Sequence, residues 1–241
     1  MINIVAKDLH YKELNEKIRK ADSVHISECN GQRYICAGMG GKTVTIDGTP
    51  GNVLGGFLGE GSTVTVHGNV QDAVGNTMDG GTIIVHGNAG DALGYAMRGG
   101  QIFVKGNAGY RAGVHVKEYK DKRPIIVIGG HAGSFLGEYQ AGGLIIVLGL
   151  GSEDGVPVGN FTGMGMHGGK IIVRTNAVDL PSTGNDINLA SATGDDLLEI
   201  APYIKQFSEY FNICSEKILD DKFIVLTPGA KNPYEQLYTY N

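Results

Sequence analysis

Two aspartates occupy equivalent places in a repeated stretch of the chain, and carboxylates in pairs can do chemistry. Asp72 and Asp91 lie 19 residues apart. If the repeat stacks them on neighbouring turns, their carboxylates lie about 5 Å apart, a separation that suits a retaining glycosidase. Alternatively, each carboxylate caps its own turn. The same column continues with Tyr110 and Ser134, and the chain has no tryptophan to form a sugar platform, so turn capping is favoured.

A pair of histidines, His67 and His86, has the same 19-residue spacing. Two imidazoles on adjacent turns could hold a metal ion. The column begins with Asp47 and continues with Lys105, so no third ligand lines up and the lysine would repel a cation. We therefore expect a polar strand end here and predict no metal-binding residues.

Two short glycine motifs match the letters of nucleotide-binding loops. Gly163-x-Gly165-x-x-Gly168 resembles a dinucleotide fingerprint, but that motif works only where a helix follows, and here the strand-like run KIIVR follows. Gly41-Lys42-Thr43 resembles the end of a phosphate-binding loop, yet Cys36 occupies the place of its first glycine. Neither motif predicts a cofactor site, and no Ser/His/Asp or Cys/His set predicts a catalytic one.

The cysteine count and the charge exclude several classes of protein. The chain has three cysteines, Cys29, Cys36 and Cys214, with no Cys-x-x-Cys pair, so we expect reduced and mostly buried thiols. A net charge of -5 and a pI near 5.8 favour neither nucleic acid nor an anionic membrane as a partner. No segment is long and apolar enough to suggest a membrane span or a signal peptide, and we expect a cytoplasmic protein.

Short apolar runs recur along the middle of the chain at a near-constant step. They read TVTID at 43–47, TVTVH at 63–67, TIIVH at 82–86, QIFVK at 101–105, PIIVI at 124–128, LIIVL at 144–148 and KIIVR at 170–174. One column, formed by Val66, Val85, Val104, Ile128, Val147 and Val173, advances by 19, 19, 24, 19 and 26 residues. This step predicts a solenoid in which each strand stacks on the next about 4.8 Å away.

Glycine recurs in the turns between these runs. The chain has 39 glycines, and the pattern Gly-x-x-Gly-x-x-x-Gly occurs at 87–94, 106–113 and 130–137. Glycine permits the positive φ angles of sharp corners. Asn69, Asn88 and Asn107 form a further column, which predicts a hydrogen-bonded ladder along the axis. We therefore predict an all-β protein with helical flanks, built as a single right-handed β-helix of about seven coils with capped ends.

The repeat defines three parts of the chain. We predict an N-terminal helix and strand cap over 1–37, the glycine-rich β-helix over 38–174, and a C-terminal extension with helices over 175–241. An open β-helix exposes strand edges at both ends, and the flanks are suited to cap them.

The flanks contain recognisable elements. An amphipathic helix is predicted over 8–21, with Asp8 as its N-cap, and a strand over 23–28. Residues 175–194 are polar and typical of turns. Two helices are predicted within 195–219, the second starting at Ser215, and they are followed by a strand at 223–226.

A third column of the repeat is apolar as well. It reads Thr45, Thr65, Ile84, Phe103, Val127, Ile146 and Ile172. By the two-residue period of a strand it points away from the first two columns, so these strands must be covered on both faces. Either the C-terminal segment or a partner protein covers the Ile84–Ile172 face.

Two insertions interrupt the repeat, at Lys117–Arg123 and at Gly151–Phe161. The first carries six charged residues in seven. It is either a solvated loop or a docking contact.

Several longer segments resemble one known family. GNTMDGG at 75–81, VHGNAGDALGYAMRGG at 85–100, GYRAGVHVKEYKD at 109–121, GEYQAGG at 137–143 and GMHGG at 165–169 resemble the glycine-motif (GXGXG) β-helix domain of the glutamate synthase large subunit. A related β-helix occurs in formylmethanofuran dehydrogenase. The flanking GQRYICAG at 31–38 and ILDD at 218–221 also resemble the glutamate synthase form.

The resemblance implies a structural subunit of a split glutamate synthase. Such a subunit joins the glutamine amidotransferase to the FMN-dependent synthase, which form glutamate from glutamine and 2-oxoglutarate. FMN and the iron–sulfur cluster are then expected on the partner subunits and not on this chain. The alternatives are a formylmethanofuran dehydrogenase-type subunit and a carbohydrate-active β-helix enzyme. The number of copies is open, with a homo-oligomer as one option.

Overall fold

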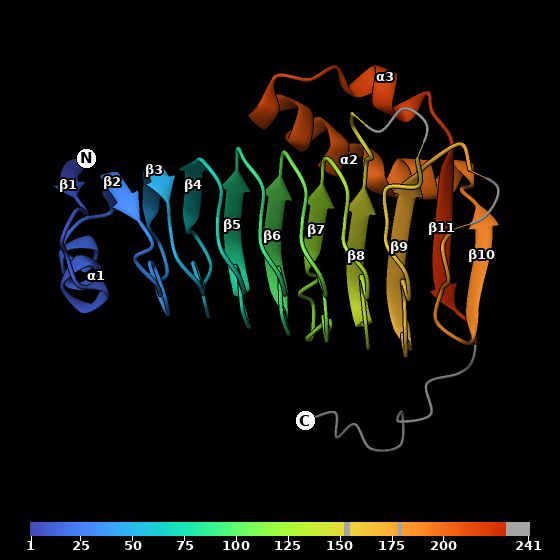
Figure 1. The fold of residues 1–241 in the computed structure, drawn as a ribbon, viewed down its shortest axis with the longest axis horizontal. Helices are drawn as coiled ribbons and strands as arrows, with labels where there is room; N and C mark the ends of the chain where they lie inside the picture. The colour runs from blue at the N-terminus through green and yellow to red at the C-terminus, as the bar shows by residue number, and fades with distance from the viewer. Residues whose placement is uncertain (152–154, 178–179, 230–241) are drawn as a thin grey trace.

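The computed structural model describes residues 1–151, 155–177 and 180–229 and forms one elongated stack of strands. Nine strands run parallel in chain order: β1 (Ile2–Val5), β2 (Ser23–Asn30), β3 (Thr43–Thr49), β4 (Thr63–His67), β5 (Asp79–Val85), β6 (Gly99–Val104), β7 (Ile125–Ile128), β8 (Ala141–Val147) and β9 (Gly168–Arg174). Then β11 (Phe223–Pro228) and β10 (Ile187–Ser191) extend the same sheet. Figure 1 shows this order as a row of arrows. The predicted right-handed β-helix with helical flanks is confirmed.

The strand register is the one that the repeat predicts. Val66 pairs with Val85 and Val85 with Val104, and the later strands continue the column through Ile128, Val147 and Val173. The two insertions do not disturb the register, because the strands on either side of each one pair at the predicted positions. Each strand therefore stacks an identical or similar side chain on the one before it.

Inside the rod, glycines make room for isoleucines. The left-handed Gly113, with φ of +70°, lies so close to Ile145 that a Cβ would come within 2.3 Å of its Cδ1. The same relation holds for Gly94 and Ile126 at 2.5 Å. These isoleucines are fully buried. The glycine column therefore serves both the backbone conformation of the corner and the close packing of the core.

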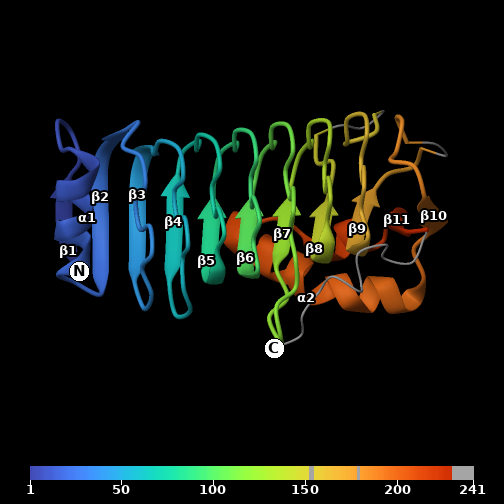
Figure 2. The same cartoon turned by 90° about the horizontal axis from the view of Figure 1, so that it is seen from below.

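The outward face of the sheet changes its chemistry along the rod. In β3 and β4 it carries Thr45 and Thr65, but from β5 onward it carries apolar residues. Helix α2 (Gly194–Phe211) covers this apolar half and leaves the threonine half free of helix (Figures 1 and 2). A second core results, which joins Ile84, Phe103, Ile125, Val127, Leu144, Ile146, Leu148 and Ile172 to Ile200, Ile204, Phe207, Phe211, Ile218, Phe223 and Val225. Of the two predicted covers, the C-terminal segment is thus the correct one.

The N-terminal flank closes the first coil. Helix α1 (Tyr11–Arg19) buries Leu14, Asn15 and Ile18. The Asn15 side chain donates to the Tyr34 carbonyl and accepts from the Cys36 N–H, both at 2.9 Å. The prediction of Asp8 as N-cap is wrong, because the cap is His10 and Asp8 lies in a turn with φ of 64°.

The C-terminal flank contains the two predicted helices and one unpredicted strand. Helix α2 starts with a capping box between Thr193 and Asp196, and α3 (Ser215–Leu219) starts where expected. The prediction of turns is wrong for residues 187–191, which form β10, antiparallel to β11. This strand depends on a partner that follows both helices in the chain, so its own sequence, INLAS, does not reveal it. The Pro/Tyr-rich tail from 230 lies outside the described residues.

Candidate functional site

The two aspartates predicted as a carboxylate pair belong to a backbone ladder. The N–H of Asp91 donates to Asp72 Oδ1 at 2.9 Å, and the N–H of Tyr110 donates to Asp91 Oδ1 at 2.8 Å. Asp72 Oδ1 also occupies the space that a side chain on Gly90 would need, since an added Cβ would stand 2.2 Å from it. Each carboxylate therefore holds the next coil in place, whereas the turn-capping interpretation placed its hydrogen bond within its own turn.

The predicted asparagine ladder is confirmed, with the main chain as its principal donor. The backbone N–H groups of Asn88, Asn107 and His131 each donate, at 2.8 Å, to the Oδ1 atom of the asparagine one coil earlier. One side-chain bond, from Asn88 Nδ2 to Asn69 Oδ1 at 3.3 Å, runs beside them. These amides link coils and are not arranged around a ligand.

The histidine column stacks on the end of helix α2. The rings of His67 and His86 lie 4.7 Å apart, and His86 meets the edge of Phe211 at 5.1 Å. Burial, with smaller contributions from His67 and Lys105, lowers the pKa of His86 below its usual range. Among the described residues, no group of three or more His, Cys, Asp or Glu could hold a metal ion. The column is a packing contact at a polar strand end.

The lysine of the phosphate-loop-like motif has a structural partner. Lys42 Nζ donates to the Ala21 carbonyl at 2.9 Å and to Asp22 Oδ1 at 3.2 Å. Together with a bond to the Arg19 carbonyl at 3.3 Å, it thereby satisfies carbonyl groups at the C-terminal end of α1. The other motif, Gly163 to Gly168, leads into β9 and not into a helix. The geometry that binds a pyrophosphate is therefore missing at both places.

The three thiols are free, and two are buried. Burial raises the pKa of Cys29 to about 11 and that of Cys36 to about 12. A nucleophilic thiol needs the opposite shift. Cys214 is exposed, at the start of α3. The prediction of reduced and mostly buried cysteines agrees with this arrangement.

The charged insertion at Lys117–Arg123 turns back onto its own chain. Lys122 Nζ lies 2.8 Å from Asp79 Oδ2 and 3.0 Å from Glu60 Oε1, and these bonds raise its pKa. Arg123 pairs with Glu199 of α2 at 2.5 Å. The insertion therefore joins earlier coils to the helix that covers the outer face.

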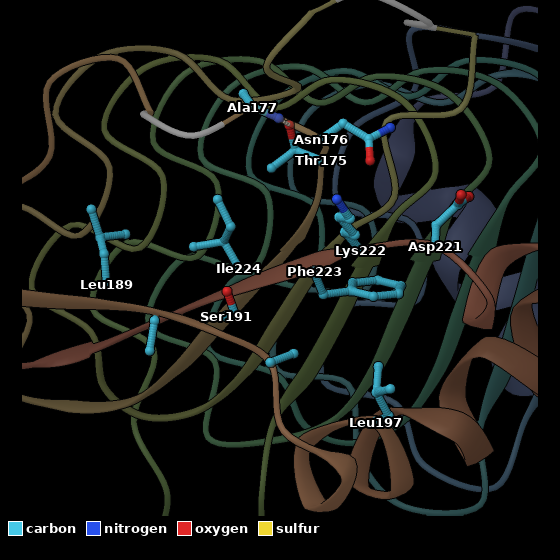
Figure 3. Close-up of a pocket in the computed structure, with 12 residues that line it drawn as sticks. Thr175, Asn176, Ala177, Leu189, Ser191, Leu197, Asp221, Lys222, Phe223 and Ile224 are labelled. Atoms are coloured by element: carbon cyan, nitrogen blue, oxygen red, sulfur yellow. Dashed lines mark hydrogen bonds between the residues drawn. The ribbon is translucent and has the colours of Figure 1, made fainter.

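A cleft lies at the C-terminal end of the rod. It has a volume of about 640 Å³ and is bounded by residues 175–177, 189–192 and 221–224, together with Leu197 (Figure 3). Asp221 is the acidic residue in it, and Arg174 Nε binds its Oδ2 at 2.6 Å. Besides Asp221 and Lys222, the walls supply apolar side chains, the hydroxyls of Thr175 and Ser191 and the amide of Asn176. A catalytic carboxylate needs a partner acid, base or nucleophile, and the described bonds of Asp221 join it to Arg174 and not to Lys222 or a hydroxyl, so no catalytic set is assembled here.

The sequence reasoning missed one prominent surface feature. Phe135 and Phe161 stack at 4.9 Å on an exposed corner of the rod, and Arg111 lies over Phe135. Phe135 and Phe161 lie in none of the quoted motifs, and Arg111 lies in the segment at 109–121. The only signal that links them is the repeat itself, since each follows the column of Asp72, Asp91 and their successors by one position.

Comparisons with known proteins agree with the architecture. A family model described as GXGXG motif matches residues 5–228. An uncharacterized protein of Methanocaldococcus jannaschii is 46% identical over 98% of this chain and 95% of its own length. A chain in the crystal structure of the formyltransferase/hydrolase complex of Methylorubrum extorquens, solved with methylofuran, has a TM-score of 0.63 at 22% identity, covering 83% of this chain and 71% of that one. That likeness concerns the fold alone.

Proposed function

Because the chain belongs to the GXGXG motif family, we propose that it is the structural, non-catalytic subunit of a split glutamate synthase. In this role it joins a glutamine amidotransferase to an FMN-dependent synthase as a rigid spacer. FMN and the iron–sulfur cluster reside on the partner subunits. The resemblance of the repeat and its flanks to the glutamate synthase β-helix supports this choice within the family.

A structural role is supported above all by how the polar columns are used. Asp72, Asp91 and the asparagines accept hydrogen bonds from the next coil. Lys42 is bound to carbonyls beyond α1. The groups that could do chemistry by type are thus occupied in joining one turn to the next. A rod built this way has a filled core and holds its two ends at a constant separation.

A second candidate is the β-helix subunit of a formylmethanofuran dehydrogenase-type complex. The observation that favours it is the structural similarity to a chain of the formyltransferase/hydrolase complex of Methylorubrum extorquens. Both candidates describe a β-helix component of a multi-subunit assembly. They differ in the chemistry of the partners.

The test is affinity purification of the tagged full-length chain from its own cells at its natural level, followed by mass spectrometry and absorbance spectroscopy. The expected result is a stoichiometric complex with a flavin- and iron–sulfur-containing protein that forms glutamate from glutamine and 2-oxoglutarate. Co-purification with formyltransferase and hydrolase subunits would instead establish the second candidate. A chain that purifies alone, or an assembly without either activity, would refute both.

A further inference from the structure

One corner of the rod presents side chains that the fold does not need. In each coil the residue after the Asp72 column has a left-handed backbone, with φ between 55° and 64° from Val53 onward. Its N–H donates to a carbonyl of the next coil, as Ala73 does to Asp91 at 2.8 Å and Phe135 to Asn160 at 2.8 Å. The column consists of Val53, Ala73, Ala92, Arg111, Phe135 and Phe161.

Equivalent positions in successive coils show how large a side chain the left-handed corner requires. Two successive coils place Ala73 and Ala92 there, so a methyl group is enough for the corner to form. A left-handed backbone costs an L-residue roughly 1–2 kcal/mol, and the larger side chains of this column are only partly buried, with Phe135 at intermediate exposure and Arg111 exposed. Phe161 is 40% exposed. Strained positions that carry large exposed side chains point to a role outside the fold.

The large side chains of this column form an ordered stack. The Arg111 guanidinium lies 4.8 Å from the centre of the Phe135 ring, and that ring stacks on Phe161 at 4.9 Å with 25° between the planes. Arg111 Nε also donates to Glu138 Oε2 at 3.0 Å. Within the described chain its terminal Nη groups make no hydrogen bond, and the side chain is 54% exposed. The guanidinium is thus held in one orientation, and the four N–H donors of its two Nη groups are unused within the described chain.

A second left-handed column runs beside the first and is aromatic over the same coils. It reads Phe57, Thr77, Ala96, His115, Tyr139 and Gly165. The His115 and Tyr139 rings stack at 5.2 Å with 10° between their planes. The Tyr139 ring extends over Gly165, where an added Cβ would stand only 2.5 Å from it. Tyr139 is 46% exposed, so both columns offer ring faces and edges to solvent.

We propose that this aromatic corner, formed by Arg111, His115, Phe135, Tyr139 and Phe161, is the docking surface for a protein partner of the complex. The inference rests on the proposed function, since it names where the partner binds. The partner contributes a carboxylate to the free Nη edge of Arg111 and apolar side chains against the rings. Charge complementarity supports this occupant, because a guanidinium fixed by stacking and by its Nε bond presents two parallel donors, the geometry that a carboxylate fits.

The composition of the corner agrees with a protein interface. Arginine and tyrosine are the residue types that carry most binding energy in interfaces, and rigid aromatic rings lose little entropy when they bind. Here the rings are already ordered by stacking, so less entropy is lost on docking.

The test uses the full chain with the purified FMN-dependent synthase and amidotransferase subunits, each titrated separately by calorimetry. Arg111→Glu reverses the charge, and Phe135→Gly removes the ring while relieving the left-handed strain. Both should weaken binding to one subunit at least about 30-fold, the effect of a hot-spot residue. Lys205→Glu, an equal charge reversal on an exposed position of α2, is the matched control and should bind like the wild type.

Thermal unfolding separates docking from folding. Phe135→Gly should melt at the wild-type temperature or above it, whereas a structural role for the ring would lower the melting point. If the wild type binds and both corner variants bind equally well, the docking surface is wrong while the proposed function stands. If the wild type binds neither subunit, the glutamate synthase assignment is wrong, and the docking proposal falls with it.

Discussion

Replacing Phe207 with alanine tests whether helix α2 is held by the outer face of the sheet. The Phe207 side chain is fully buried, and its ring meets Phe211 at 4.7 Å. Its Cζ atom stands over Gly129, where an added Cβ would lie 2.7 Å away. The ring therefore fills the space that the glycine leaves open in the sheet. Its loss leaves a cavity between the helix and the strands.

The expected cost follows from the burial of the whole ring. A Phe→Ala change in a core destabilises by about 3–5 kcal/mol, through lost transfer energy and the residual cavity. Helix α2 contacts the rod through this second core and a few ion pairs. The substitution should therefore lower the free energy that holds α2 on the sheet. Each 1.4 kcal/mol is tenfold in an equilibrium constant, so the helix should open roughly 100- to 4000-fold more often.

Native-state hydrogen exchange measures this directly. In Phe207→Ala the amides of α2 should lose protection by that factor, while those of β2 to β4, which the helix does not cover, should keep theirs. Leu198→Ala is the control on the same helix, because Leu198 is 73% exposed and its loss should change little. Equal protection of α2 in both variants would refute the claim that the apolar sheet face holds the helix.

Three further perturbations test the packing and the ladders. The lowered pKa of His86 means that folding favours its neutral ring, so the free energy of unfolding should fall as the pH drops below about 6.5. NMR titration of the ring and urea unfolding at several pH values measure this effect. The variant His86→Gln should abolish that part of the pH dependence. Gln140→Leu removes the buried amide that donates to the carbonyls of Gly142 and Gly143 at 3.0 and 3.2 Å. The free energy of unfolding, measured with denaturant, should fall by about 1–3 kcal/mol. A variant as stable as the wild type would show that the amide is dispensable. Asp91→Asn keeps the ladder acceptor and should preserve the melting temperature, whereas Asp91→Ala should lower it; equal melting of the two would argue against the ladder.

The functional proposals depend on features that sequence reasoning reached only in part. The repeat step placed Asp72 on Asp91 and His67 on His86, and these contacts are present. It left open whether the carboxylates act as a catalytic pair, because spacing does not tell which donors approach them. Only the tertiary structure shows that the donors to these carboxylates are backbone N–H groups of the following coil.

Periodicity by itself determined the architecture of this protein. A step of 19 residues with β-branched runs and corner glycines admits one solution, since a strand of about five residues is stable only when neighbours stack on it. Helix start signals also located both C-terminal helices. These features depend on the spacing of residues along the chain, which can be read directly from the sequence.

The tertiary structure decided which residues far apart in the chain come into contact. It placed α2 on the Ile84–Ile172 face, paired β10 with β11, and stacked Phe135 on Phe161 across 26 residues. The sequence left the cover of the Ile84–Ile172 face open between two candidates, linked Phe135 to Phe161 only through the repeat, and gave no signal for the pairing of β10 with β11. The free energy that selects them comes from burial and stacking between coils, which exist only once the rod has formed.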